Sequence, residues 1–164
     1  MTRRELEVKD PAVIQNILDG SKFLHLGLVD DGMPYVVPMS YGYKMEDGKL
    51  TLYLHSASKG YKLDVIAKNP TCCFEMEYGV EPFVGKIPCQ YGITYYSLMG
   101  RGKAVMVEDV TEKEQAMTLL MKTQTGRDFD FNERLVSIVS VIRIDVSAYT
   151  AKHRPLPGQE PNQK

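Results

Sequence analysis

Hydrophobic and polar positions alternate along much of the chain with the period of two that is typical of β-strands. Leu50, Leu52 and Leu54, for example, alternate with Thr51 and Tyr53. Runs of this kind, rich in β-branched and aromatic residues, predict six strands over residues 23–29, 33–43, 50–55, 71–78, 93–108 and 138–146. Asp-Asp-Gly and Glu-Asp-Gly triplets after the first two runs predict tight hairpin turns.

A period nearer 3.6 predicts three short helices between these strands. The first follows a capping Asp10 and ends at Gly20. The second occupies about residues 63–67. The third opens with a capping box at 111–114 and continues through an apolar stripe at 117–121. We expect these helices to pack on the outside of the sheet.

The order of these elements predicts one mainly β domain over residues 1–152, followed by a flexible, proline-rich tail over 153–164. Hairpin-linked strands interrupted by short helices favour a small six-stranded antiparallel β-barrel with peripheral helices. A doubly wound sheet is not expected, because regular strand–helix alternation is absent from the sequence. Glycines and prolines over 79–92 predict a long loop.

Composition narrows the class of protein. The 164 residues are 43% hydrophobic and 25% charged, with a net charge of −1, as in ordinary globular domains. The charges form no like-sign block, so we expect no nucleic-acid surface, and no apolar run is long enough to span a membrane. The N-terminal stretch is unlike a signal peptide, which favours a cytoplasmic location. The three cysteines and three histidines lack zinc-type spacing, so no metal site is expected.

The most informative polar stretch lies between the third predicted strand and the second predicted helix. It contains His55, Ser56, Ser58, Gly60 and Lys62. A helix N-terminus offers free amides and partial positive charge, to which hydroxyls, a lysine and a glycine would add a phosphate cradle. The alternative is a surface turn with capping serines. Residue types alone leave both interpretations open.

Five motifs in series resemble one protein family, at residues 32–43, 52–57, 60–63, 69–74 and 96–104. They are similar to the FMN-binding split barrels of the pyridoxamine 5′-phosphate oxidase type, in the branch that contains 5-nitroimidazole resistance proteins. The resemblance covers roughly residues 3–152. It implies a homodimer in which each FMN lies in a cleft between the two subunits.

The resemblance also implies which residues contact FMN. These are Pro38, Met39, Ser40 and Tyr41 along the second predicted strand; His55, Ser56, Ala57, Ser58, Lys59, Gly60 and Lys62 from the third strand to the phosphate; and Ser97, Met99 and Gly100 on the long strand or across the dimer seam. One departure is Tyr61, which stands where relatives often carry a basic residue. Lys59 is the candidate for restoring that charge.

The activity that the resemblance implies is FMN-dependent reduction of small electrophiles, such as nitroaromatics, by a reduced nicotinamide donor (NADH or NADPH). His55 would either donate a proton or only orient the cofactor. His25, within an apolar strand, is expected to be a satisfied core or barrel-mouth residue, and His153 a solvated one in the tail. The alternatives are a flavin-binding redox sensor without turnover and a haem-binding split barrel; deazaflavin also remains open. Oxidation of vitamin B6 is not expected.

Overall fold

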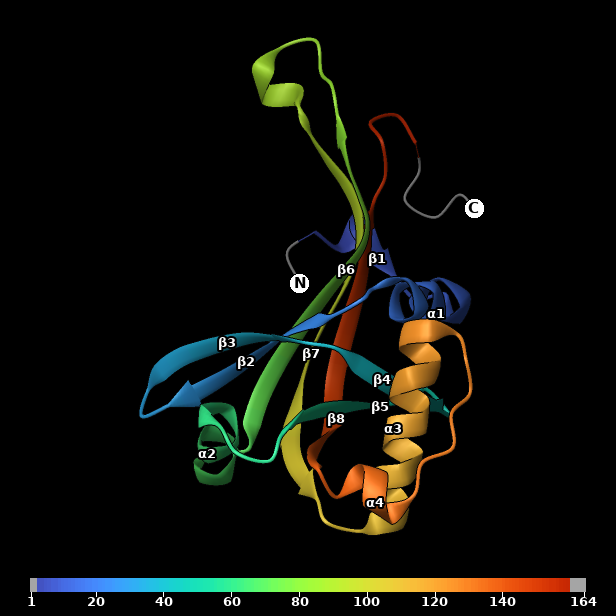
Figure 1. Cartoon of the computed structure of the whole chain (residues 1–164). Coiled ribbons are helices and arrows are strands. Elements are labelled where there is room, and N and C mark those ends of the chain that lie inside the picture. Colours follow the sequence, from blue (N-terminus) through green and yellow to red (C-terminus); the bar gives the residue numbers. More distant parts are fainter. Residues whose placement is uncertain (1–2, 160–164) are drawn as a thin grey trace.

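The computed structural model describes residues 3–159, and one antiparallel sheet of eight strands dominates that part of the chain (Figure 1). Its order is β3-β2-β6-β7-β8-β5-β4, with β1 paired to β8. The strands are β1 (Glu7–Val8), β2 (Leu24–Asp30), β3 (Met33–Met39), β4 (Tyr41–Glu46), β5 (Lys49–Ala57), β6 (Thr71–Phe83), β7 (Gly92–Val107) and β8 (Val139–Arg154). The two ends of this order, β3 and β4, are consecutive in the chain, so the sheet curls into a split barrel.

The predicted fold class, mainly antiparallel β with a few helices, is confirmed. The strand count differs from six for two reasons. The run 33–43 is divided at Ser40, because β3 pairs with β2 whereas β4 pairs with β5. The two-residue β1 pairs with the end of β8 and carries too little sequence pattern to predict.

The core lies inside the barrel and is filled by alternate side chains of its strands. Leu52 and Leu54 on β5 have no exposed surface, and neither does Leu26 on β2. The long strands add inward side chains that are at most 2% exposed, among them Phe74, Met76, Leu98, Ile142 and Ile144. The predicted period of two therefore separates core residues from outer-face residues along these strands.

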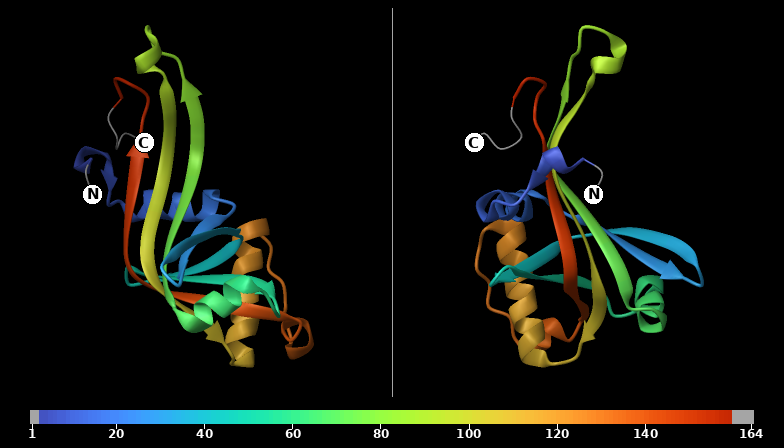
Figure 2. Two further views of the ribbon diagram at one scale, coloured as in Figure 1. Left: turned by 90° about the vertical axis from the view of Figure 1, so that its left-hand side faces the viewer. Right: turned by 180° about the vertical axis from the view of Figure 1, so that it is seen from behind.

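The helices lie outside the barrel and are α1 (Pro11–Gly20), α2 (Tyr61–Lys68), α3 (Val110–Thr125) and α4 (Glu133–Val136), with 3₁₀ turns η1 (Arg4–Leu6) and η2 (Pro88–Gln90) (Figure 2). Asp10 caps α1 as predicted. The cap of α3 is Asp109, whose Oδ1 accepts the Glu112 amide at 2.8 Å, so the box predicted to begin at Thr111 starts two residues too late. Within residues 3–159, no helix is both long and apolar enough to cross a membrane.

The predicted loop 79–92 is confirmed only over residues 84–91, because β6 runs to Phe83 and β7 starts at Gly92. Residues 79–94 form the end of a hairpin that projects beyond the barrel, here named the arm (Figure 1). β6 continues through a register shift between Tyr78 and Glu81 and pairs with β7 as far as Phe83. Gly79 takes a φ of 62°, a value that marks a bulge here rather than a strand end. The glycine was therefore a correct sign of irregular backbone, but not of a loop.

The predicted flexible tail begins too early. β8 runs to Arg154, pairing with β7 along the base of the arm, and it includes His153. The His153 side chain is 9% exposed and its ring stacks on Tyr96 with 3.9 Å between centroids. The expectation of a solvated His153 is therefore wrong, because the long β7 needs a partner strand of matching length. Residues 160–164 of the predicted tail lie outside the described part of the chain.

Close packing at Gly42 fixes α3 against the barrel. A Cβ atom at this position of β4 would clash with the backbone of Leu119 and Leu120 in α3. Gln124 of the same helix donates from Nε2 to the Tyr41 carbonyl at 2.8 Å. Helix and strand therefore approach more closely than any side chain at Gly42 would allow.

We expect Gly42→Ala to lower the free energy of unfolding by about 1–3 kcal/mol, because the added methyl forces α3 away from β4. Urea denaturation of the two proteins measures this difference. Lys44→Ala is the matched control, since Lys44 lies on the same strand with its side chain exposed. Equal losses in the two variants would contradict the close approach.

Candidate functional site

The junction between β5 and α2 brings together two of the predicted phosphate residues. Ser56 continues the inward series of β5 at the end of the barrel and is 7% exposed. Lys62, in the first turn of α2, donates from Nζ to the Ser56 hydroxyl at 3.1 Å. The burial of Val65 and Ile66 in the core holds α2 over this end of the barrel. A buried hydroxyl and an ammonium group therefore meet beside the first two amides of α2, which precede the Leu63 and Asp64 amides that donate to the Gly60 carbonyl.

Gly60 precedes α2 in a conformation that other residues rarely adopt. Its φ and ψ are 154° and 156°, and a Cβ added there would meet no atom within 4 Å. The space beside the backbone at Gly60 is thus open. A ligand can approach the first amides of α2 from this side.

His55 and Ser40 form a second pair on the outer face of the barrel. These residues lie on adjacent segments, β5 and the β3–β4 junction, and both side chains are half-buried. Ser40 Oγ and His55 Nε2 are 3.3 Å apart. Because neighbouring side chains of a strand point to opposite faces, His55 faces outward whereas Ser56 faces the barrel end. A single ligand that contacts both His55 and Ser56 must therefore cross the rim of the barrel, near the end of β5 at Ala57.

The structure corrects two predicted contacts along the second predicted strand. Tyr41 has no exposed surface, and its hydroxyl donates to the Leu18 carbonyl at 2.7 Å inside the core. Met39 is 8% exposed and belongs to the same core. The side chains of Pro38 and Ser40 alternate with them and point outward. The strand period therefore places the side chains of Met39 and Tyr41 in the core and leaves only those of Pro38 and Ser40 on the surface.

The remaining residues of the β5–α2 turn are solvent-facing. Ala57, Ser58 and Lys59 are exposed. Tyr61 donates to Asp30 Oδ2 at 2.6 Å and packs edge-on against Tyr35. Tyr61 thus ties α2 to β2 and β3 and adds no charge to the Ser56–Lys62 pair.

Ser97, Met99 and Gly100 lie apart from this junction, on β7. Ser97 and Met99 line a hollow of about 410 Å³ on the outer face of the sheet, together with Glu75, Glu77, Val80, Ile93, Tyr95 and Lys152. Gly100 is half-buried, and its backbone packs on the Phe74 ring. Within one chain, therefore, the predicted residues form two separate groups rather than one pocket.

Three titratable side chains that the sequence did not connect gather beside the hollow. His25 on β2 pairs directly with Glu75 on β6, and its Nδ1 lies 3.3 Å from Glu75 Oε2. Burial, and then the neighbouring Glu77, raise the pKa of Glu75 to about 7, although His25 opposes this shift. His25 is hydrogen-bonded as expected; of the core and barrel-mouth positions predicted for it, the core is excluded, because its side chain is 38% exposed on the outer face. The only sequence signal was the Glu-x-Glu spacing, which puts both carboxylates on one face of β6.

Comparisons with known proteins agree with this architecture. Residues 10–153 match the model of the family described as pyridoxamine 5′-phosphate oxidase. A candidate 5-nitroimidazole antibiotic resistance protein from Bacteroides thetaiotaomicron is 32% identical, with 90% of this chain and 86% of that chain covered and a TM-score of 0.76. No curated protein sequence gives a significant match.

Two more distant structures share the fold. The flavocytochrome Anf3 from Azotobacter vinelandii is 17% identical, over 94% of this chain and 72% of that chain, with a TM-score of 0.74. An FAD and haem binding protein from Mycobacterium smegmatis is 15% identical, over 98% and 77% of the two chains, with a TM-score of 0.76. With the matched family model and the Bacteroides relative, the split barrel and its ordered motifs show that the chain belongs to the pyridoxamine 5′-phosphate oxidase family, in the branch related to 5-nitroimidazole resistance proteins.

Proposed function

We propose that the protein is an FMN-dependent oxidoreductase that reduces small electrophiles, such as nitroaromatics, with electrons from a reduced nicotinamide. The observation that carries this proposal is the Lys62 ammonium beside the buried Ser56 hydroxyl at the start of α2. The 32% identity to a candidate nitroimidazole resistance protein supports the choice of substrate class.

The donor set at the β5–α2 junction fits a phosphate monoester. It combines a cation, a hydroxyl and helix-start amides, and the backbone at Gly60 leaves open space beside them. Charge-assisted hydrogen bonds of this kind are about twice as strong as neutral ones. Lys62 and Ser56 would therefore hold the phosphate of FMN, with Gly60 permitting its close approach.

The rest of the cofactor would lie across the rim and along the outer face. When bound, FMN supplies the electron or hydride transfer itself. The protein's part is to position the ring and manage protons. His55 is the residue we assign to proton donation, and the Ser40 hydroxyl 3.3 Å away would fix the orientation of its ring. Pro38, exposed on the same outer face, would flank the isoalloxazine.

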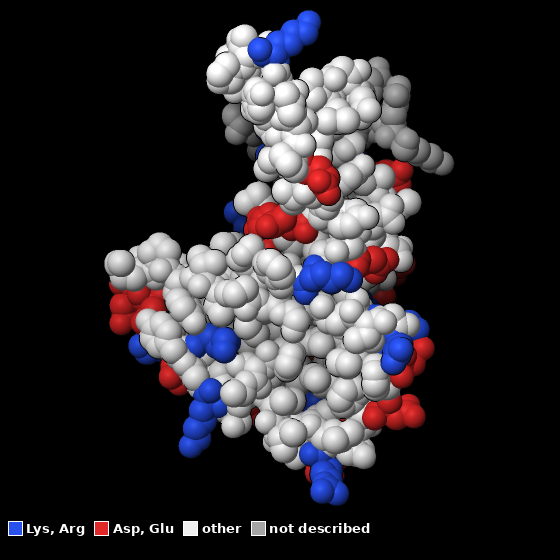
Figure 3. Space-filling view, turned by 45° about the horizontal axis from the view of Figure 1, so that its top comes forward, with Lys and Arg blue, Asp and Glu red and all other residues white. Residues whose placement is uncertain are grey.

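We further propose that the protein works as a homodimer with FMN at the subunit interface. One support is the separation of the Ser56–Lys62 junction from Ser97 and Met99, which a second subunit would bring to the same cofactor. Another is the arm, whose exposed apolar side chains include Val84 (78%) and Ile87 (51%). Most of the arm's visible surface is uncharged (Figure 3). Exposed apolar surface of this kind is typical of protein interfaces.

The cytoplasm is the location we propose. All three cysteines, Cys72, Cys73 and Cys89, are free thiols, as is usual in reducing compartments. Cys72 is buried, whereas Cys73 is exposed on the outer face of β6, so only one of the two neighbouring thiols lies in the core.

The purified protein should carry FMN, and Lys62→Met should weaken FMN binding about tenfold to a hundredfold, because a charge-assisted bond worth about 1.5–3 kcal/mol is lost. Flavin fluorescence during titration of the FMN-free protein measures this. Lys68→Met at the other end of α2 removes the same charge and is the control. A haem absorption spectrum, or equal affinities for the two variants, would refute the assignment.

His55→Asn should keep FMN but lower the rate of nitroimidazole reduction by NADH about a hundredfold or more, since a positioned proton donor is lost. Ser40→Ala should lower it less, because it removes only the partner that orients His55. Steady-state kinetics with FMN content measured in each sample provides the comparison. An unchanged rate in His55→Asn would leave His55 with an orienting role at most.

The double variant Val84→Asp/Ile87→Asp should run as a monomer and lose FMN, because two charges enter the apolar arm. Light scattering after size exclusion measures the mass. Ile138→Asp, at an equally exposed apolar position (72%) that precedes β8, should remain dimeric. A dimeric arm variant would show that the arm is not the interface.

A further inference from the structure

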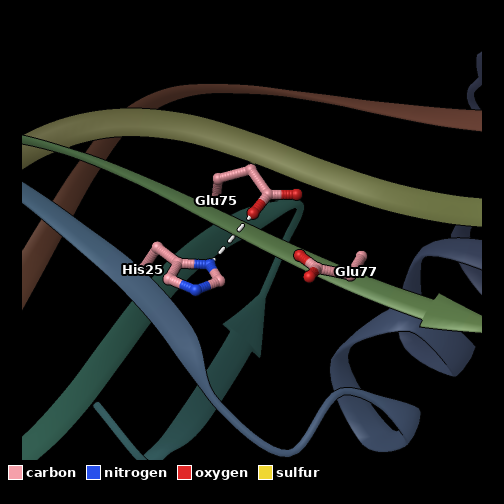
Figure 4. A group of neighbouring side chains, drawn as sticks. All are labelled: His25, Glu75 and Glu77. Atoms are coloured by element: carbon pink, nitrogen blue, oxygen red, sulfur yellow. Dashed lines mark hydrogen bonds and ion pairs between the residues drawn. The ribbon is translucent and has the colours of Figure 1, made fainter. Parts of the chain in front are cut away.

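The cluster formed by His25, Glu75 and Glu77 has the arrangement of a metal-binding site (Figure 4). His25 and Glu75 are directly opposed on neighbouring strands, and Glu77 lies two residues further along the same face of β6. One ligand atom from each of the three side chains lies within 4.8 Å of the others. The sheet register therefore fixes the backbone positions of the three residues relative to one another before any ligand binds.

The spacing is close to what a single ion requires. Ligand atoms about 2.1 Å from a tetrahedral ion lie about 3.4 Å from one another. His25 Nδ1 and Glu75 Oε2 are already 3.3 Å apart. Glu77 has a flexible side chain whose carboxylate points toward the imidazole (Figure 4), so a small torsional change brings its oxygen into range.

We propose that His25, Glu75 and Glu77 bind a divalent transition-metal ion such as Zn²⁺. An imidazole nitrogen selects for zinc and its first-row neighbours, whereas two carboxylates alone would suit Mg²⁺ or Ca²⁺. In the single chain the His25 and Glu75 side chains are 38% and 31% exposed, so an ion can reach them from solvent before subunits associate. Three protein ligands leave at least one coordination position for water or another small ligand.

The charges that face the cluster favour a cation, with one opposing group. Glu75 and Glu77 bring two carboxylates, and Lys152 of β8 lines the same hollow. The other side chains around the cluster are uncharged: the Phe23 ring contacts His25, and Ser97, Tyr95, Met99, Val80 and Ile93 line the hollow. Lys152 repels a bound cation but is not a ligand. Removing its charge should therefore strengthen metal binding, whereas removing a ligand should weaken it.

Zn²⁺ binding to the full, tag-free chain, measured against a chromophoric chelator at mildly alkaline pH, tests the proposal. We expect a single Zn²⁺ per chain in the cluster. His25→Asn, Glu75→Gln and Glu77→Gln should each weaken binding at least about tenfold, since even residues that only support a ligand cost that much. Lys152→Met should strengthen it several-fold, because the opposing charge is removed.

Glu81→Gln, an exposed carboxylate further along β6, is the matched control and should bind as the wild type does. Melting temperatures in excess chelator show whether each variant is folded. Binding of Co²⁺ should give a visible spectrum that His25→Asn abolishes. Absence of stoichiometric Zn²⁺ binding by the wild type, or equal affinities of Glu75→Gln and Glu81→Gln, would overturn the site. The cluster borders the hollow that Ser97 and Met99 also line, so FMN content and mass in solution are measured for each variant. A loss of Zn²⁺ binding with unchanged FMN content and mass is then distinct from a failure of the proposed flavin site.

Discussion

The filling of the barrel by its own side chains is the constraint on which every proposed site depends. Leu26, Leu52, Leu54, Met76 and Ile142 are completely buried, so the interior has no space for a flat tricyclic ring. Functional side chains must therefore lie on outward strand positions or at the rim. Ser40, His55, His25 and Glu75 are outward, and Ser56 with Lys62 lies at the rim. A large cofactor on the outer face would be shielded from solvent only by a second protein surface, which a second subunit of the proposed dimer would provide.

Much of the fold could be predicted from the sequence because alternation and caps are local signals. The six predicted runs overlap seven of the eight strands, and the Asp10 cap follows from the same kind of signal. What failed depended on pairing between distant segments. The strand break at Ser40 occurs because the chain changes partners from β2 to β5. Residues 79–83, Gly92 and His153 became strand because β6, β7 and β8 extend one another beyond the barrel. The residue pattern within one strand contains no information about which distant strand it pairs with.

The candidate site was predicted in part for the same reason. Ser56 and Lys62 are close in sequence, and the structure brings them together at 3.1 Å. The side chains of Met39 and Tyr41 belong to the core, which a motif match without strand phase cannot reveal. The cluster of His25 with Glu75 and Glu77 joins residues about 50 positions apart through sheet register, and a search for Cys and His spacing could not find it.

The phosphate contact at the β5–α2 junction is the central claim, because it decides the class of cofactor and places the remainder of that cofactor across the rim. The most direct test compares the affinity of the flavin-free protein for FMN and for riboflavin, which differ only in the phosphate. We predict that FMN binds at least about tenfold more tightly, as the loss of charge-assisted hydrogen bonds requires. Equal affinities for the two flavins would contradict the account.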